Sequence, residues 1–262
     1  MPKLTAAGRQ LEYQWFDPPH DNVRPDAPVL VFLHEGLGSL AMWKDFPARV
    51  AVATGCRALV YSRYGYGKSD RLQQARGVDY MHAEALTALP EVLQRLDIRN
   101  PVLVGHSDGA SIALIHAGAA QCPVRALVLL APHVFVEDLT VASIAAARDA
   151  YRTTDLPAKL GRYHDDVDNT FWGWNDIWLD PEFRHWNIEA LLPHIACPVL
   201  AIQGQDDEYG TMAQLDCVAR RIDDVTLIKL ANCHHSPHRD QPVAVIKAVS
   251  NFVDGLRDRD TG

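Results

Sequence analysis

Short apolar runs alternate with helix-like stretches through the first half of the chain. Runs of strand length occupy residues 29–33, 57–62, 101–104 and 124–132. Strands of this kind, separated by segments with helical spacing, are typical of βαβ units. The pattern therefore predicts an α/β fold, with a mostly parallel central sheet and helices on both faces.

The pattern changes between residues 134 and 193, where helical spacing continues without a convincing strand. Residues 138–151 have an alanine-rich amphipathic spacing, and residues 181–192 have a second one after an Asp-Pro start. Strand-like runs return only after this segment. We therefore expect a core domain formed by residues 1–133 and 194–262, with a small helical insertion at 134–193.

The most specific chemical signal is Gly105-His106-Ser107-Asp108-Gly109, which follows the apolar run at 101–104 and precedes a helical stretch rich in Ala and Ile. This G-x-S-x-G arrangement between a strand and a helix is the nucleophile elbow. The turn is so tight that a Cβ at either glycine would clash with neighbouring backbone, and it holds the serine in a strained conformation. The following helix directs its amide groups to the same place. The pattern predicts that Ser107 is a nucleophile.

A carboxylate and a histidine follow two later strand-like runs. Residues 198–203 lead into Gly204-Gln205-Asp206-Asp207-Glu208, and residues 225–230 lead into a segment that contains His234 and His235. Serine needs a neighbouring base to remove its proton, and that base needs a carboxylate to hold it in one tautomer. The chain order Ser, Asp, His therefore predicts a catalytic triad at one edge of the sheet.

With these motifs the chain resembles the α/β-hydrolase superfamily over essentially its whole length. The resemblance rests on the elbow, on the acid turn after Gly204, on the segment His235-Ser236-Pro237-His238 and on an early loop, His34-Glu35-Gly36. It implies an α/β-hydrolase fold and a serine hydrolase activity without a cofactor. It also implies that the insertion at 134–193 is a helical cap over the catalytic edge.

The resemblance assigns the acid and the base as well. By the family's spacing the acid is Asp207, with Asp206 as the alternative, and the base is His235. His234 stands where the family usually has glycine, so we expect its ring to point away from the base or to pack beneath it. No acidic or thiol ligand set at metal spacing accompanies the paired histidines, so no metal site is expected.

An oxyanion hole is implied after the apolar run at 29–33. In the resembling family, one backbone amide comes from the loop after this strand and the other from the residue that follows the nucleophile. Here these are the amides of Gly36 and Asp108. Glu35 stands where the family more often has glycine, and its side chain is expected to turn to solvent or to meet a basic neighbour.

Asp108 places a negative charge beside the expected oxyanion, which slows nucleophilic attack unless another group offsets it. One interpretation is a structural salt bridge with Arg63 or Arg148. The other is recognition of a cationic substrate group. The Ser-Asp-Gly elbow resembles the α-amino-acid ester hydrolases of the biphenyl-hydrolase-like group, in which that aspartate takes the substrate ammonium.

Aromatic residues crowd one stretch of the expected cap, which holds four of the chain's six tryptophans. Such residues pack a small cap against the main domain, and some of them form an apolar roof over the substrate pocket. Trp172, Trp174 and Trp178 are the candidates in the cap. Trp43 follows the expected oxyanion loop and His133 ends the strand before the cap, so both are further candidates for the pocket.

The composition fits a soluble enzyme. The chain has 262 residues, of which 48% are hydrophobic and 22% charged, and it is long enough to form one large core. A net charge of −8 argues against nucleic acid or an anionic membrane as a partner. The N-terminus has no apolar signal core, and five scattered cysteines fit a reducing compartment, so we expect a cytoplasmic location.

Together these features predict a serine hydrolase that cleaves a small-molecule carboxylic ester, or a related acyl bond, through an acyl-enzyme. Ser107 attacks the carbonyl, His235 transfers the proton and Asp207 orients the histidine. Two alternatives use the same groups. One is carbon–carbon bond hydrolysis of ring-cleavage products, and the other is a small-molecule sensor that binds its ligand in a triad-bearing pocket.

Overall fold

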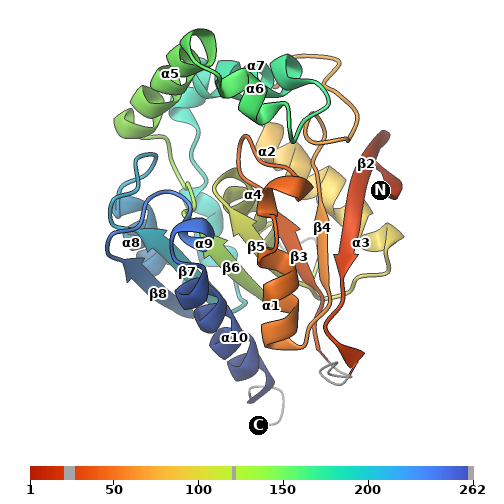
Figure 1. Ribbon diagram of the computed structural model, residues 1–262. Helices are drawn as coiled ribbons and strands as arrows, with labels where there is room; N and C mark the ends of the chain where they lie inside the picture. Colours follow the sequence, from red (N-terminus) through yellow and green to blue (C-terminus); the bar gives the residue numbers. More distant parts are fainter. Residues whose placement is uncertain (21–26, 120–121, 259–262) are drawn as a thin grey trace.

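The computed structural model describes residues 1–20, 27–119 and 122–258. Within these residues one eight-stranded sheet has the order β1-β2-β4-β3-β5-β6-β7-β8 (Figure 1). The strands are β1 (Lys3–Ala6), β2 (Arg9–Phe16), β3 (Leu30–Leu33), β4 (Ala58–Tyr61), β5 (Val102–His106), β6 (Ala126–Leu130), β7 (Val199–Gly204) and β8 (Val225–Leu230).

Strands β3 to β8 are parallel to one another, as the hydrophobic pattern predicted. Strands β3 to β7 are buried along their whole length, because helices cover both faces of the sheet. The pattern did not predict β1 and β2, which form an antiparallel edge. Polar and half-buried residues interrupt the apolar positions of β2, so this strand lacks a continuous hydrophobic run. The predicted α/β class is confirmed.

Two helical layers cover the sheet (Figure 1). Leu30 and Phe32 point to one layer, and Val31 and Leu33 point to the other, because successive strand residues face opposite sides. The first layer contains α1 (Phe46–Thr54) and α10 (Pro242–Asp258), with η2 (Leu40–Trp43) and α9 (Pro237–Asp240) beside them. The second contains α2 (Tyr80–Ala83), η3 (Glu84–Ala88), α3 (Leu89–Arg95), α4 (Asp108–Gly118) and α8 (Ala213–Arg221). None of the helices in the described ranges has the length and apolarity that crossing a bilayer requires.

The inserted segment consists of α5 (Asp138–Thr153), α6 (Leu156–Leu160), α7 (Val167–Trp178), η4 (Glu182–His185) and η5 (Glu189–His194). Its helices α5, α6 and α7 lie beyond the carboxyl ends of the strands (Figure 1), whereas η5 packs against α4 and α8. The helix expected at 138–151 is present. The one expected at 181–192 is replaced by two short 3₁₀ helices, and between them Asn187 pairs with Phe135 in a β-bridge. The division into a core domain and a cap at 134–193 stays a prediction.

Hydrogen bonds join the insertion to two loops of the core. His164 accepts a bond from the N–H of Gly67 at 2.9 Å and lies 3.0 Å from the carbonyl oxygen of Leu37, to which its other nitrogen donates. The Thr170 hydroxyl donates to the carbonyl of Gly65 at 2.7 Å. Gly65 and Gly67 have positive φ angles of 87° and 59°, a conformation that favours glycine. This turn after β4 therefore holds the insertion next to the loop that follows β3.

Candidate active site

Ser107 lies at the sharp turn between β5 and α4, with φ 53° and ψ −118°. A positive φ is uncommon for serine and marks local strain. The flanking glycines make the turn possible. A Cβ on Gly105 would lie 2.4 Å from the carbonyl oxygen of Gly109, and a Cβ on Gly109 would lie 2.0 Å from that of Leu33. This is the geometry expected of a nucleophile elbow.

Three side chains form a hydrogen-bonded chain after the carboxyl ends of β5, β7 and β8. His235 Nε2 lies 3.0 Å from Ser107 Oγ, and His235 Nδ1 lies 2.8 and 3.0 Å from the two carboxylate oxygens of Asp207. With its proton on Nδ1 donated to the carboxylate, the imidazole can accept the serine proton at Nε2. The arrangement is therefore able to perform nucleophilic catalysis.

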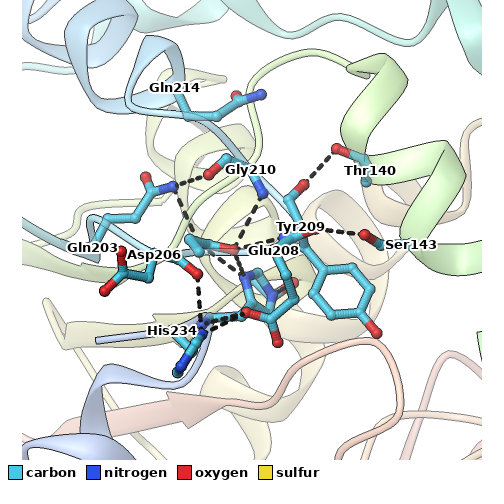
Figure 2. Close-up of polar contacts among 12 residues, drawn as sticks. Thr140, Ser143, Gln203, Asp206, Glu208, Tyr209, Gly210, Gln214 and His234 are labelled. Carbon is cyan, nitrogen blue, oxygen red and sulfur yellow. Dashed lines mark hydrogen bonds and ion pairs between the residues drawn. The ribbon is translucent and has the colours of Figure 1, made fainter. Parts of the chain in front are cut away.

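The end of β7 and the loop after it hold the Asp207 carboxylate in place through Gln203, Tyr209 and Gly210, which are labelled in Figure 2. The N–H groups of Tyr209 and Gly210 donate to Oδ1 at 2.8 and 3.1 Å, and the Gln203 side chain donates to Oδ2 at 3.1 Å. Burial alone would raise the pKa of Asp207, but its interactions with His235 and with the Tyr209 amide outweigh burial and hold the pKa below its usual range. The carboxylate is therefore ionised at neutral pH, as stabilisation of an imidazolium requires.

The sequence neighbours of the acid and base, Asp206 and His234, are exposed. The ring of His234 lies 3.1 Å from the backbone carbonyl oxygen of Asp206 and 3.6 Å from the Glu208 carboxylate, as Figure 2 shows. The His234 ring thus points away from the base, which is one of the two positions expected for it. Of the candidates, Asp207 and His235 are the two that join Ser107 in the hydrogen-bonded chain, and their catalytic roles stay a prediction.

Gly36 and Asp108 line the same small cavity as Ser107 and His235. Asp108 is the first residue of α4, so its N–H lies at the positive end of the helix dipole. A Cβ on Gly36 would lie 2.1 Å from Trp174 Nε1, so only glycine allows the loop to approach this tryptophan. The two residues whose amides are expected to bind an oxyanion therefore lie together beside the proposed nucleophile.

Glu35 joins the loop after β3 to α9 and to the end of β5. Its carboxylate accepts a bond from Arg239 at 2.9 Å and lies 3.4 Å from His106 Nδ1. Burial alone would raise the pKa of Glu35, but His106 and Arg239 hold the pKa well below its usual range. The side chain thus meets basic neighbours, one of the two outcomes expected for it.

His106 is a residue that the sequence analysis missed. Its Nε2 donates to the backbone carbonyl of His235 at 2.8 Å and so supports the loop that carries the base. The sequence carried one signal for His106. It is a polar residue at the buried end of a strand, directly before the proposed nucleophile Ser107. In the described part of the chain, no group of three or more His, Cys, Asp or Glu side chains is arranged to hold a metal ion.

The Asp108 side chain is 1% exposed and lies beside the proposed nucleophile. Its Oδ2 accepts a hydrogen bond from the Tyr80 hydroxyl at 2.6 Å and lies 3.7 Å from Arg63 Nη2. Trp178 Nε1 in turn donates to the Tyr80 oxygen at 3.1 Å. Among the described residues Oδ1 has no hydrogen-bond partner. Of the two arginines expected as partners, Arg63 rather than Arg148 is the one beside Asp108.

The cavity at the triad is small, with a volume of about 100 Å³. Four of the expected substrate-binding residues line it, namely Asp108, His133, Trp174 and Trp178. The other lining residues are Glu35, Gly36, Leu37, Ser107, Thr140, Ile144, Tyr209 and His235. Helices of the insertion therefore form part of the wall of this cavity.

Trp43 and Trp172, which were expected in the pocket, do not line this cavity. Trp43 is 2% exposed and stacks on Phe46 in the apolar layer beside α1. On a helix, residues four apart share a face and residues two apart do not. Trp174 and Trp178 are four apart on α7 and both face the cavity, whereas Trp172 lines a separate depression on the surface.

We expect His133 to make the protein less stable as the pH falls from 7 to 5. Burial, together with the neighbouring His235, lowers the pKa of His133 to about 3, whereas a histidine of the unfolded chain titrates near about 6.5. Between these values the unfolded state binds more protons, so the free energy of unfolding decreases as the pH falls. For His133 alone, the decrease between pH 7 and pH 5 is about 2 kcal/mol.

Urea unfolding of the wild type and of His133→Gln at the two pH values measures this contribution. Between pH 7 and pH 5 the free energy of unfolding of the variant should decrease by about 2 kcal/mol less than that of the wild type. Burial also lowers the pKa values of His34 and His238, and their contribution should be the same in both proteins. An equal decrease in the free energy of unfolding of the two proteins would show that His133 does not cause the pH dependence.

Comparison with known proteins shows the family. The sequence model described as "Alpha/beta hydrolase family" matches residues 30–248 of this chain. The chain therefore belongs to the α/β-hydrolase family, and its sheet and helices form the α/β-hydrolase fold, as the sequence resemblance predicted.

Individual relatives share parts of the sequence or the whole fold. A protein of Stutzerimonas stutzeri (strain A1501), named "Putative carbamate hydrolase RutD", is 36% identical over 97 residues, which cover 36% of this chain and 34% of that protein. The match thus spans about a third of the relative's length. The enol-lactonase from Burkholderia xenovorans LB400 has a TM-score of 0.75 and 19% identity over 97% of this chain and 100% of its own. The esterase EaEST from Exiguobacterium antarcticum has a TM-score of 0.76 and 19% identity over 96% and 98%.

Proposed function

We propose that this α/β hydrolase is a serine hydrolase that cleaves the carboxylic ester bond, or a related acyl bond, of a small molecule. The observation that carries the proposal is the hydrogen-bonded chain of Ser107, His235 and Asp207 beside a cavity lined by Gly36 and Asp108. A nucleophile, a base within reach and an orienting carboxylate are the groups that acyl transfer needs. The names esterase, enol-lactonase and carbamate hydrolase among the relatives support the same class of reaction.

In the proposed reaction, Ser107 Oγ attacks the ester carbonyl while His235 Nε2 takes its proton. Asp207 stabilises the imidazolium, and the amides of Gly36 and Asp108 donate to the oxyanion of the tetrahedral intermediate. The C–O bond of the ester then breaks, and the leaving alcohol takes the proton from His235. Water attacks the resulting acyl-enzyme with the same assistance, which releases the acid and restores the serine.

Two measurements test this function together. Steady-state kinetics on p-nitrophenyl esters should show multiple turnover, and a fluorophosphonate should label Ser107 in a peptide map. Hydrolysis of a dienoate ring-cleavage product in place of esters would favour the carbon–carbon bond alternative. A bound metabolite with negligible turnover of esters and carbamates would favour the sensor.

We expect the protein to prefer esters with short acyl chains. Its cavity of about 100 Å³ is smaller than the roughly 150 Å³ that holds benzene in an engineered core. Because overpacking costs about 1–3 kcal/mol, kcat/KM should fall by about tenfold or more between butyrate and octanoate esters. A series of p-nitrophenyl esters from acetate to decanoate measures this profile.

Trp174→Leu should widen the cavity and raise the ratio of octanoate to acetate hydrolysis. Trp172→Leu is the matched control, because Trp172 lies on the same helix and does not line the cavity. The ratio is unaffected by a general loss of activity, so it reports the size of the cavity alone. An unchanged ratio in Trp174→Leu, or the same shift in both variants, would show that this wall does not select the chain length.

Asp108 supports a second specificity, for substrates with a cationic amino group. The residue lines the cavity, and its Oδ1 has no hydrogen-bond partner among the described residues. A buried carboxylate attracts a cation strongly, although Arg63 already balances part of this charge. We therefore expect the alanine ester of one alcohol to have a higher kcat/KM than the matched propionate ester.

Asp108→Asn retains the backbone amide and removes the charge, so it should reduce this preference by about 1–3 kcal/mol. The ratio of the two kcat/KM values in each protein is the measurement. Equal kcat/KM values for the two esters in the wild type would show that the Asp108 carboxylate does not bind the substrate and only contacts Arg63 and Tyr80.

A further inference from the structure

Arg63 is a fully buried cation beside the proposed oxyanion hole, directly after β4. Its Nη2 donates to the carbonyl oxygens of Glu35 at 3.0 Å and His34 at 3.2 Å, and it lies 3.7 Å from Asp108 Oδ2. No step of the proposed reaction uses this side chain. It nevertheless contacts both residues whose amides are proposed to bind the oxyanion. For Gly36 the contact is with the peptide unit that carries its N–H, and for Asp108 it is with the side chain.

The first contact acts on one peptide group. The carbonyl of Glu35 and the N–H of Gly36 belong to the same planar unit. A guanidinium that donates to this carbonyl draws electron density from the unit, so the N–H becomes a stronger donor. The hydrogen bond also fixes the plane of the unit and therefore the direction of the N–H. The backbone N–H of Arg63 holds the start of the same loop, because it donates to His34 Nε2 at 3.0 Å.

The second contact acts on charge. The oxyanion would form beside Asp108, and an unbalanced carboxylate in this buried place would oppose it. The guanidinium of Arg63 supplies a positive charge on the side of Asp108 that carries Oδ2. Burial disfavours that charge, but the neighbouring Tyr66, Asp108 and Glu84 outweigh burial and raise the pKa of Arg63 above its usual value. Arg63 is therefore a cation at neutral pH.

We propose that Arg63 is a positioning residue of the oxyanion hole, which orients and strengthens the Gly36 amide and balances the charge of Asp108. The proposal rests on the serine hydrolase function proposed above. Arg63 does not line the cavity, so it acts through groups that meet the transition state. Its loss should therefore lower kcat and leave KM nearly unchanged. An arginine that only supports the fold would change stability and leave the kcat of the folded enzyme intact.

Arg63→Met removes the charge and the hydrogen bonds while it retains much of the side-chain length. Arg76→Met is the matched control, because both guanidinium groups stack on the Tyr66 ring, at 4.7 and 4.9 Å, while Arg76 donates to the carbonyl of Tyr64 instead of the oxyanion loop. Four quantities are measured for each protein. They are kcat and KM for p-nitrophenyl acetate, the melting temperature, and the rate at which a fluorophosphonate labels Ser107, since its phosphoryl oxygen enters the same hole.

Loss of one direct oxyanion donor lowers kcat by about 10²–10³, so loss of Arg63 should lower kcat and the labelling rate by about ten- to hundredfold. KM should stay within about twofold. Arg76→Met should lower the melting temperature without a comparable loss of kcat. In an Asp108→Asn background the Arg63 substitution should lower kcat by only about three- to tenfold, because the carboxylate charge of Asp108 no longer has to be balanced.

Equal kcat values in Arg63→Met and Arg76→Met, or losses that follow the melting temperature, would overturn the proposal. If Arg63→Met does not fold, Arg63→Met/Asp108→Asn is compared with Asp108→Asn, since the double variant removes the cation together with the carboxylate of Asp108. A loss in kcat of about three- to tenfold at constant KM is then expected from the Gly36 amide, and no loss overturns the proposal. A wild type that neither hydrolyses the ester nor reacts at Ser107 refutes the proposed function itself.

Discussion

Replacing Ser107 with alanine is expected to lower kcat for ester hydrolysis by about 10⁶-fold while the fold and the melting temperature stay nearly unchanged. The substitution removes the oxygen that lies 3.0 Å from His235 Nε2, so the base has no nucleophile to deprotonate. Residual catalysis of about 10³–10⁴ over water can persist from the oxyanion hole and from binding. Kinetics on p-nitrophenyl acetate and a thermal unfolding curve measure the two effects.

Ser111→Ala is the matched control, because Ser111 is buried on the next turn of α4 and donates to the backbone carbonyl of His133 at 2.7 Å. Its loss should cost about 1 kcal/mol of stability and leave most of kcat. A fluorophosphonate should label the wild type and Ser111→Ala but not Ser107→Ala. Full activity in Ser107→Ala, or labelling of another serine, would contradict the assignment of the nucleophile.

Replacing Asp207 with asparagine is expected to lower kcat by about 10⁴-fold, because an amide does not hold the base in the productive tautomer. The neighbouring Asp206→Asn should remain within several-fold of the wild type, since Asp206 is exposed. By the same reasoning, His235→Ala should lower kcat strongly and His234→Ala should lower it only slightly. The kcat values of the four variants, measured with one ester, give the comparison.

The paired design separates a catalytic role from a general effect on the loop, because each sensitive residue has an adjacent neighbour of the same type. Both members of a pair belong to the same loop. Sensitivity of Asp206 or His234 in place of its neighbour would mean that the loop adopts another register in solution. Equal sensitivity of both members would indicate loss of the loop structure.

The parallel part of the sheet could be predicted because each central strand is a continuous apolar run with a helical segment after it. β2 could not be predicted in this way, because it lies near the edge, most of its residues are half-buried and polar residues stand between its apolar ones. The segment 181–192 has helical spacing, but a β-bridge between Asn187 and Phe135 interrupts it. Spacing reports a local preference, and a distant contact can override it.

The candidate triad could also be predicted, because the chain order and the strand-to-turn positions are local features. The family spacing chose Asp207 and His235 over their neighbours, and in the structure His235 lies between Ser107 and Asp207 and contacts both. Trp174 and Trp178 could have been separated from Trp172 by their spacing of four residues on one helix. His106 had only a weak signal, a polar residue at the buried end of a strand.

The sequence by itself determined the α/β class, the position of the strained serine turn and the order of the groups that follow the strands. These depend on short segments whose hydrophobicity, glycine content and spacing are sufficient to specify them. Only the tertiary structure decided which arginine lies beside Asp108, which tryptophans face the cavity and how small that cavity is. Each of these depends on how side chains from segments far apart in the chain fill one space, and no local pattern contains that information.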